Sequence, residues 1–221
     1  MPITISGSGT ITGLTTGGLP DGSIAAGDLS STLDLTGKTV TLPSGTGGKI
    51  LQVATAVKTD VFSYTSQSFT DVTDLSVNLT PSNTNNRIIL MASVFVSVRG
   101  NTSAPYVAFG KGGSVITAST GDAAGSRPRV TGAHYNGDYG DNSVIYSVIP
   151  MMYSETAGAT TQQTYSVMIR QGGSITMYVN QSITDRDTAN YEPRGISTLM
   201  AMEVSASVSY THLTLPTKRI V

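Results

Sequence analysis

From residue 49 onward, apolar and polar residues alternate in short segments that Gly, Asn and Pro separate. A period of two is typical of strands with one buried face, because successive side chains point to opposite sides of a sheet. The segments recur about every 8–12 residues, and no helical segment lies between them. They cover residues 49–57, 61–64, 68–72, 75–79, 87–98, 106–109, 114–118, 127–133, 143–152, 164–170, 174–179 and 195–206. The pattern predicts an all-β fold, an antiparallel β-sandwich similar to a jelly roll.

Residues 87–98 (RIILMASVFVSV) form the longest apolar stretch and are expected to be a central strand. Periodicity alone also allows a buried helix, but the β-branched content and the flanking Gly and Asn residues favour a strand. The pair Gly112-Gly113 predicts a hairpin turn. Residues 164–170 and 174–179 are likewise expected to pair as a hairpin around residues 171–173.

The first 48 residues have a different composition. Single Ile, Leu or Val residues recur between Gly, Ser and Thr, and the segment has no aromatic residue. Such a segment cannot by itself bury enough apolar surface to offset the entropy lost on ordering. We expect residues 1–48 to be an extended arm, ordered by association with its own copies and used for attachment to other proteins. A flexible linker is the alternative. Residues 49–206 would then form the head domain.

The C-terminal residues are best left out of the fold. Residues 208–221 (VSYTHLTLPTKRIV) resemble one reading frame of a transposase-type sequencing adaptor, so we treat residues 207–221 as a non-native tail. Without Lys218 and Arg219 the formal net charge falls from −1 to −3. His134 is then the only histidine of the natural sequence.

Composition excludes several classes of function. Charged residues are 12% of the chain and the net charge is not positive, which argues against a nucleic-acid binder. The absence of Cys excludes disulfides and thiolate metal sites, and it suits assembly in a bacterial cytoplasm. No apolar run reaches the roughly 18 residues of a membrane span, and no signal peptide opens the chain. We expect no nucleic-acid partner, no membrane insertion and no cofactor.

Several stretches of the head carry a resemblance to known proteins. They are KILQV at 49–53, the run from KTDVFSYTS to RIILMASV at 58–94, GDAAGSRPR at 121–129, YSVMIR at 165–170, YVNQSITDRD at 178–187 and STLMAMEV at 197–204. With the phrase GTITGLTTGGLPDGSI of the arm, they resemble a family of tail-fibre-like virion structural proteins of tailed bacteriophages. Members typically finish on a strand of the form S-T-x-x-x-M-E-x. The resemblance implies a homotrimeric appendage subunit located on the virion, and it carries no catalytic motif.

The loop HYNGDYGDN is the first candidate site, because aromatic rings stack on sugars and amide or carboxylate groups bond their hydroxyls. A catalytic triad with His134 would need a converging Ser, Asp and oxyanion hole, and no G-x-S-x-G elbow is present. The alternative is a loop that is only solvated. The residues expected to contact a bacterial surface glycan are His134, Tyr135, Asn136, Asp138 and Tyr139.

The second candidate site is the charged triplet of Asp185, Arg186 and Asp187. Its carboxylates could hold Ca²⁺ or act as the two acids of a glycoside hydrolase, but Arg186 lies between them and no Gly-x-Asp repeat accompanies them. Ion pairs between subunits, with Arg127 and Arg129 or with Arg194, are the favoured interpretation. We therefore expect no metal site and no enzymatic activity.

Three functions remain open. The favoured one is a trimeric phage appendage subunit whose head binds a host-surface receptor, with affinity multiplied by its three copies. The second is a decoration or fibre-shaft protein of the virion without a receptor. The third and least favoured is a depolymerase of capsular glycan, which would use Asp185 and Asp187.

Overall fold

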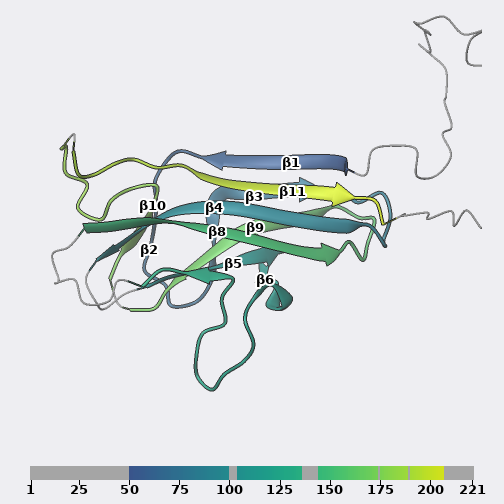
Figure 1. Ribbon diagram of the computed structural model, residues 1–221, viewed down its shortest axis with the longest axis horizontal. Helices are drawn as coiled ribbons and strands as arrows, with labels where there is room; N and C mark the ends of the chain where they lie inside the picture. Colours follow the sequence, from purple (N-terminus) through teal and green to yellow (C-terminus); the bar gives the residue numbers. More distant parts are fainter. Residues whose placement is uncertain (1–49, 100–103, 136–143, 174, 189, 207–221) are drawn as a thin grey trace, which may run out of the picture. The chain divides into compact units, whose positions relative to one another are not determined.

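The computed structural model describes residues 50–99, 104–135, 144–173, 175–188 and 190–206. These residues form an all-β fold of two antiparallel sheets (Figure 1), which confirms the all-β, antiparallel part of the predicted fold class. The predicted arm and the predicted non-native tail lie outside the described residues. Within the described ranges, no helix is long and apolar enough to cross a bilayer.

The first sheet, sheet A, is built around β4 (Arg87–Arg99). Strand β4 pairs over its whole length with β8 (Val144–Thr156), which forms one edge of the sheet. On its other side β4 pairs with β11 (Ser197–Val204), and β11 pairs with β1 (Ile50–Lys58). Residues 87–98 are therefore a central strand, as the sequence predicts. Two short strands, β2 (Phe62–Tyr64) and β10 (Met177–Val179), extend the sheet beside the C-terminal half of β4.

The second sheet, sheet B, has β9 (Gln163–Gln171) between β3 (Thr70–Leu79) and β5 (Pro105–Lys111). Two short strands, β6 (Ser114–Val115) and β7 (Gly132–Ala133), pair with different parts of the free side of β5. The main strands are thus ordered β1-β11-β4-β8 in one sheet and β3-β9-β5-β7 in the other. This is the strand order of a jelly roll, in which the chain repeatedly crosses between two sheets.

The core lies between the two sheets and follows the alternation of the strands. Every second residue of β4 from Ile88 to Val96 points into the core and is at most 8% exposed. Sheet B contributes the facing side chains Val107, Phe109, Tyr165, Val167 and Ile169, all of them fully buried. Burying a large apolar side chain contributes about 1.5–3 kcal/mol, so these layers hold the sheets together.

The predicted hairpin of residues 164–170 and 174–179 is wrong. Strand β9 belongs to sheet B and β10 to sheet A, so the chain crosses between sheets instead of turning back. The end of β9 and the residue after it are fixed to other loops: the Nε2 of Gln171 donates to the carbonyl of Thr65 at 2.5 Å, and the N–H of Gly172 donates to the carbonyl of Ala104 at 2.9 Å. These long-range bonds compete successfully with the local turn.

Four other predicted strands also differ. Residues 68–72 and 75–79 join into the single strand β3, with a register irregularity around Asp74, whose φ is 63°. Residues 114–118 and 127–133 are strand only at β6 and β7. A 3₁₀ turn at Thr117–Ser119 follows β6, and there the hydroxyls of Ser119 and Thr120 bond backbone carbonyls three residues earlier. Such local bonds draw the backbone away from a ladder. The Gly112-Gly113 turn is confirmed, with positive φ at both residues.

Candidate functional site

Two candidate sites are expected, the loop that starts at His134 and the charged triplet 185–187. Their described residues lie at the same end of the sandwich. At this end β4 stops and β5 and β8 start, and residues 180–196 connect β10 to β11 (Figure 1). Strand β1 begins and β11 ends at the opposite end of the sandwich. The end with residues 180–196 is called the loop end below.

Asn180 holds the base of the 180–196 loop. Its side chain is fully buried, and its Nδ2 donates to the carbonyls of Lys58 at 2.8 Å and Asp60 at 3.0 Å. Its Oδ1 accepts a hydrogen bond of 2.7 Å from the hydroxyl of Ser197, and its carbonyl accepts from the N–H of Gly195. With φ at 65°, the residue adopts a left-handed conformation that Asn tolerates better than most residues. The two ends of the loop are therefore joined through one buried amide.

Gly195 closes the loop against an aromatic side chain. A Cβ atom at this position would lie 2.3 Å from Cγ of Phe95, so only glycine fits beside the ring. On strand β8, the ring of Tyr146 stacks on Phe95 with 5.7 Å between centroids. The loop thus returns to sheet A over a fixed aromatic surface.

Glu192 organises the interior of the loop. Its carboxylate accepts hydrogen bonds from the hydroxyls of Ser182 at 2.9 Å and Thr184 at 2.6 Å, and from the backbone N–H of Arg186 at 2.5 Å. The Nε of Arg186 forms an ion pair with the same carboxylate. Burial raises the pKa of Glu192, but these hydrogen bonds outweigh it and lower the pKa to about 2. A fixed, charged carboxylate therefore shapes a loop that is otherwise exposed.

The predicted charged triplet is only part of this arrangement. Asp185 forms an ion pair of 2.6 Å with Arg194 of the same chain, and both side chains are about half exposed. Pairs of this kind contribute about 0–1 kcal/mol, so they orient the loop more than they stabilise it. Asp187 is exposed. Sequence reasoning missed Glu192; its only signal was a carboxylate six residues after Arg186, with Ser and Thr hydroxyls nearby.

Arg127 and Arg129 lie in a different region, the long connection between β6 and β7. Arg129 donates from Nε to the carbonyl of Gly121 at 2.6 Å and from Nη2 to that of Thr117 at 3.3 Å. Arg127 donates to the carbonyl of Ala124 at 3.4 Å. Both side chains thus brace their own loop. Ion pairs between subunits are expected for Arg127 and Arg129 and for the triplet 185–187. These pairs remain a prediction.

The glycan loop predicted from HYNGDYGDN is described only at its start. The backbone N–H of His134 donates to the carbonyl of Pro105 at 3.2 Å, which fixes the start of this loop to the edge of β5. Tyr135 is 65% exposed. Asn136, Asp138 and Tyr139 lie outside the described residues, so the predicted contacts of this loop stay a prediction.

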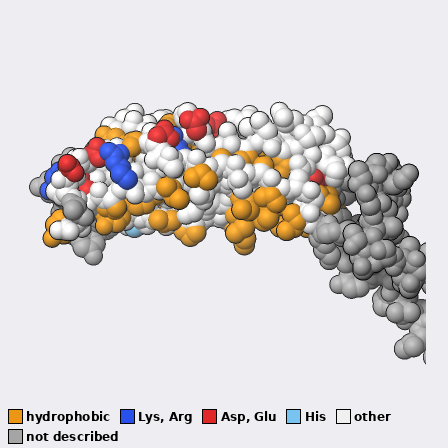
Figure 2. Space-filling model, turned by 90° about the horizontal axis from the view of Figure 1, so that it is seen from above, with side chains coloured by type: hydrophobic (Ala, Val, Ile, Leu, Met, Phe, Trp, Pro, Cys, Tyr) orange, Lys and Arg blue, Asp and Glu red, His pale blue; other side chains and the backbone are white. Residues whose placement is uncertain are grey.

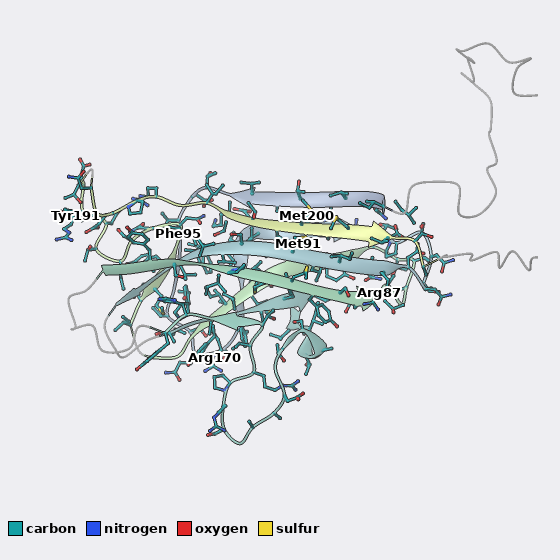
Figure 3. The ribbon with its side chains drawn as sticks, in the orientation of Figure 1. Arg87, Met91, Phe95, Arg170, Tyr191 and Met200 are labelled. Atoms are coloured by element: carbon teal, nitrogen blue, oxygen red, sulfur yellow. The ribbon has the colours of Figure 1, made fainter. Side chains whose placement is uncertain are left out.

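Tyr191 is a candidate contact residue that sequence reasoning missed. Its ring is 71% exposed and lies at the extremity of the loop end (Figure 3). It directly precedes Glu192, so the backbone that carries the ring is held by the bonds of that carboxylate. An exposed aromatic ring on a fixed loop is well suited to stacking on a flat apolar ligand face. In the described ranges, no three His, Asp or Glu side chains gather as metal ligands would.

A second buried carboxylate closes the opposite end of the sandwich. Glu203 on β11 accepts hydrogen bonds from the side chains of Gln52, Ser82 and Asn86, at 2.5–2.8 Å. Burial raises the pKa of Glu203, and these bonds outweigh it and lower the pKa to about 2. The turn at residues 82–86 is therefore fixed to the end of β11, and this network has a structural role.

Comparisons with known proteins found no match. No protein-family model matches the chain, and no curated protein matches it. The functional argument consequently depends on the loop end and on the surfaces of the sandwich.

Proposed function

We propose that this chain is a virion structural protein of a tailed bacteriophage, a homotrimeric tail-fibre-like subunit whose head binds a glycan on the host surface. In this proposal residues 1–48 attach the subunit to other tail or virion proteins. The chain assembles in the bacterial host cytoplasm and acts outside it, on the tail or on the particle surface.

The main support is that the attachment side and the candidate receptor site lie at opposite ends of the sandwich. Strand β1, which follows the arm in sequence, begins at one end, and the loop with the exposed Tyr191 lies at the other. An attachment protein needs this separation, because its anchor and its receptor site must be able to act at the same time. Binding residues are commonly placed on loops that a rigid scaffold positions.

The chemistry of the loop end suits a neutral or weakly charged sugar. Tyr191 and Tyr135 offer exposed rings for stacking, and the exposed side chains of Arg186, Asp187 and Thr188 offer polar groups close to Tyr191 in sequence. A single shallow site of this kind binds weakly. Three copies on one trimer would raise the effective affinity by avidity.

Glycan binding by the full-length chain tests this proposal. An array of bacterial surface polysaccharides would be probed with the wild type, Tyr191→Ala and Tyr191→Phe. We expect binding by the wild type and Tyr191→Phe, which keeps the ring, and at least tenfold weaker binding by Tyr191→Ala. Equal binding by all three proteins would exclude Tyr191 from the site, and no binding to any polysaccharide would remove the adhesive function.

A decoration or shaft protein without a receptor is the second candidate. The largely apolar outer face of sheet A favours it, because such a face suits contacts between proteins of the particle. Labelling intact particles with an antibody against this chain separates the two candidates: the tail tip is expected for a receptor-binding subunit, and the capsid surface or fibre shaft for a decoration.

A further inference from the structure

The outer face of sheet A presents apolar side chains in rows across four strands. Because the register of all four strands is known, the outward residues can be read directly. The central row consists of Thr55, Met200, Met91 and Met152, and the rows beside it are Val53, Met202, Ile89 and Ser154 on one side and Val57, Thr198, Ser93 and Pro150 on the other. We call these three rows the methionine face. Val148 and Tyr146 continue it along β8.

This face is exposed although it is largely apolar. Met152 is 70% exposed, Val57 60%, Val53 51% and Met91 43%. None of the outward residues in the three rows carries a charge. Figure 2 shows hydrophobic side chains gathered along one long side of the molecule, while most charged side chains visible there lie away from it.

The middle of the methionine face is hollowed. A concavity of about 750 Å³ lies over the central row and the neighbouring row of Val57, and it is lined by residues 55–57, 91–93, 150–152 and 198–200. Met91 and Met200 lie side by side on neighbouring strands beneath it (Figure 3). Met152 stands at its rim on the edge strand. The face therefore has both a depression and a projecting flexible side chain.

The size of this surface suits the apolar centre of a protein interface. Strands rise about 3.3 Å per residue and lie about 4.8 Å apart, so three rows across four strands present a face of roughly 300 Å². Val148 and Tyr146 extend this apolar area along β8. The largest apolar patch of a typical monomer is about 300–600 Å² and often functional, and a stable interface buries about 800 Å² on each partner, so the methionine face would supply the centre of an interface and its surroundings the rest.

The chemistry of the face favours a second copy of the same chain over a different partner. The three rows themselves carry no charge, and Arg87 of the adjoining row bonds Ser154 at their border, so two copies can meet along the rows without repulsion between them. Methionine side chains adapt to irregular surfaces, so a projecting Met152 can enter the hollow of a neighbouring copy. Closed symmetric association of identical chains is also the commonest form of oligomer.

We propose that the methionine face is the surface through which copies of this chain associate, with the faces of three heads turned toward a common axis. The number of copies rests on the trimer of the proposed function, but the choice of surface does not. Burial of Met91, Met152 and Val53 in the assembly follows directly from this arrangement.

Light scattering on the full-length chain tests the surface. Met152→Glu would place an unpaired carboxylate in each buried face, and we expect it to weaken association at least roughly a hundredfold and to leave monomers. Ser76→Glu is the matched control, because it adds the same charge at an exposed outward position of β3 in sheet B. Met152→Leu keeps the face apolar. Both are expected to keep the mass of the wild type.

Oxidation of the wild type by dilute hydrogen peroxide is a second readout that does not need a variant to fold. We expect Met152 and Met91 to be oxidised at least tenfold more slowly in the assembly than in the chain diluted to monomers. Met177, which is fully buried in the sandwich, should be protected in both states.

The outcomes separate the surface from the proposed function. A trimer that Met152→Glu dissociates supports both, and a dimer that it dissociates keeps the surface but removes the proposed trimer. A trimer that is unaffected, with rapid oxidation of Met152, overturns the surface and leaves the proposed function standing. A monomer overturns the surface, and slow oxidation of Met152 in that monomer would show that the chain's own residues cover it.

Discussion

The hydroxyl of Ser197 donates a hydrogen bond of 2.7 Å to the buried Oδ1 of Asn180, and this bond joins the first residue of β11 to the residue after β10. The same hydroxyl accepts a bond of 3.0 Å from the N–H of Phe95 on β4. Three segments of sheet A are thus connected at the base of the 180–196 loop. The position of Tyr191 depends on this connection, although Tyr191 itself takes no part in it.

Replacing Asn180 should destabilise the whole sandwich. Asn180→Ala leaves the carbonyls of Lys58 and Asp60 without their donor and forces Ala into a left-handed conformation. Unpaired buried polar groups cost about 1–3 kcal/mol, so we expect a loss of about 3 kcal/mol in the free energy of unfolding, measured with urea. Asn190→Ala, at an exposed position of the same loop, should change it by less than about 0.5 kcal/mol.

The contact of Gly195 with Phe95 predicts a strong effect of a single methyl group. In Gly195→Ala the Cβ would overlap the ring of Phe95, which must move away from Tyr146. Overpacking of this kind costs about 1–3 kcal/mol. Gly121→Ala is the control, because a Cβ there would meet nothing within 4 Å. Equal melting temperatures for the two variants would contradict the close packing at Gly195.

The pKa of Glu203 predicts a loss of stability in acid. Its folded pKa of about 2 lies below its ordinary value of 4.5, so the unfolded chain takes up the proton first as the pH falls. The stabilisation is complete well above pH 4.5 and is lost as the pH falls toward 2. Over this window we expect the wild type to lose on the order of 3 kcal/mol more than Glu203→Gln. Glu192 titrates in the same window in both proteins, so its contribution cancels. Parallel stability curves for the two proteins would refute the role of Glu203.

Glu192 should control the mobility of the loop end. Glu192→Gln removes the charge that accepts the backbone N–H of Arg186 and pairs with its side chain. We expect amide hydrogen exchange of residues 182–192 to become roughly tenfold faster while the strands stay protected. Asp187→Asn removes a neighbouring exposed charge and should leave this exchange unchanged. Faster exchange throughout the sheets would instead indicate global destabilisation.

Many of the strands could be predicted from the local alternation of apolar and polar residues in the sequence. Residues 87–98 became the central strand because inward Ile, Leu and Val residues alternate with outward ones, a pattern that needs no knowledge of partners. The prediction failed where long-range bonds competed with local turns. Gln171 and Gly172 bond Thr65 and Ala104, and the expected hairpin is therefore a crossover between sheets.

The sequence by itself determined the all-β class, the central strand and the Gly112-Gly113 turn, because period-two alternation and glycines with positive φ act over a few residues. Only the tertiary structure decided the order of the strands, the role of Glu192 and the alignment of Met91, Met152 and Met200 in one row. These methionines are separated by about fifty residues or more along the chain. Their neighbourhood depends on which strands pair and in which register, and that choice is made by the packing of the whole core.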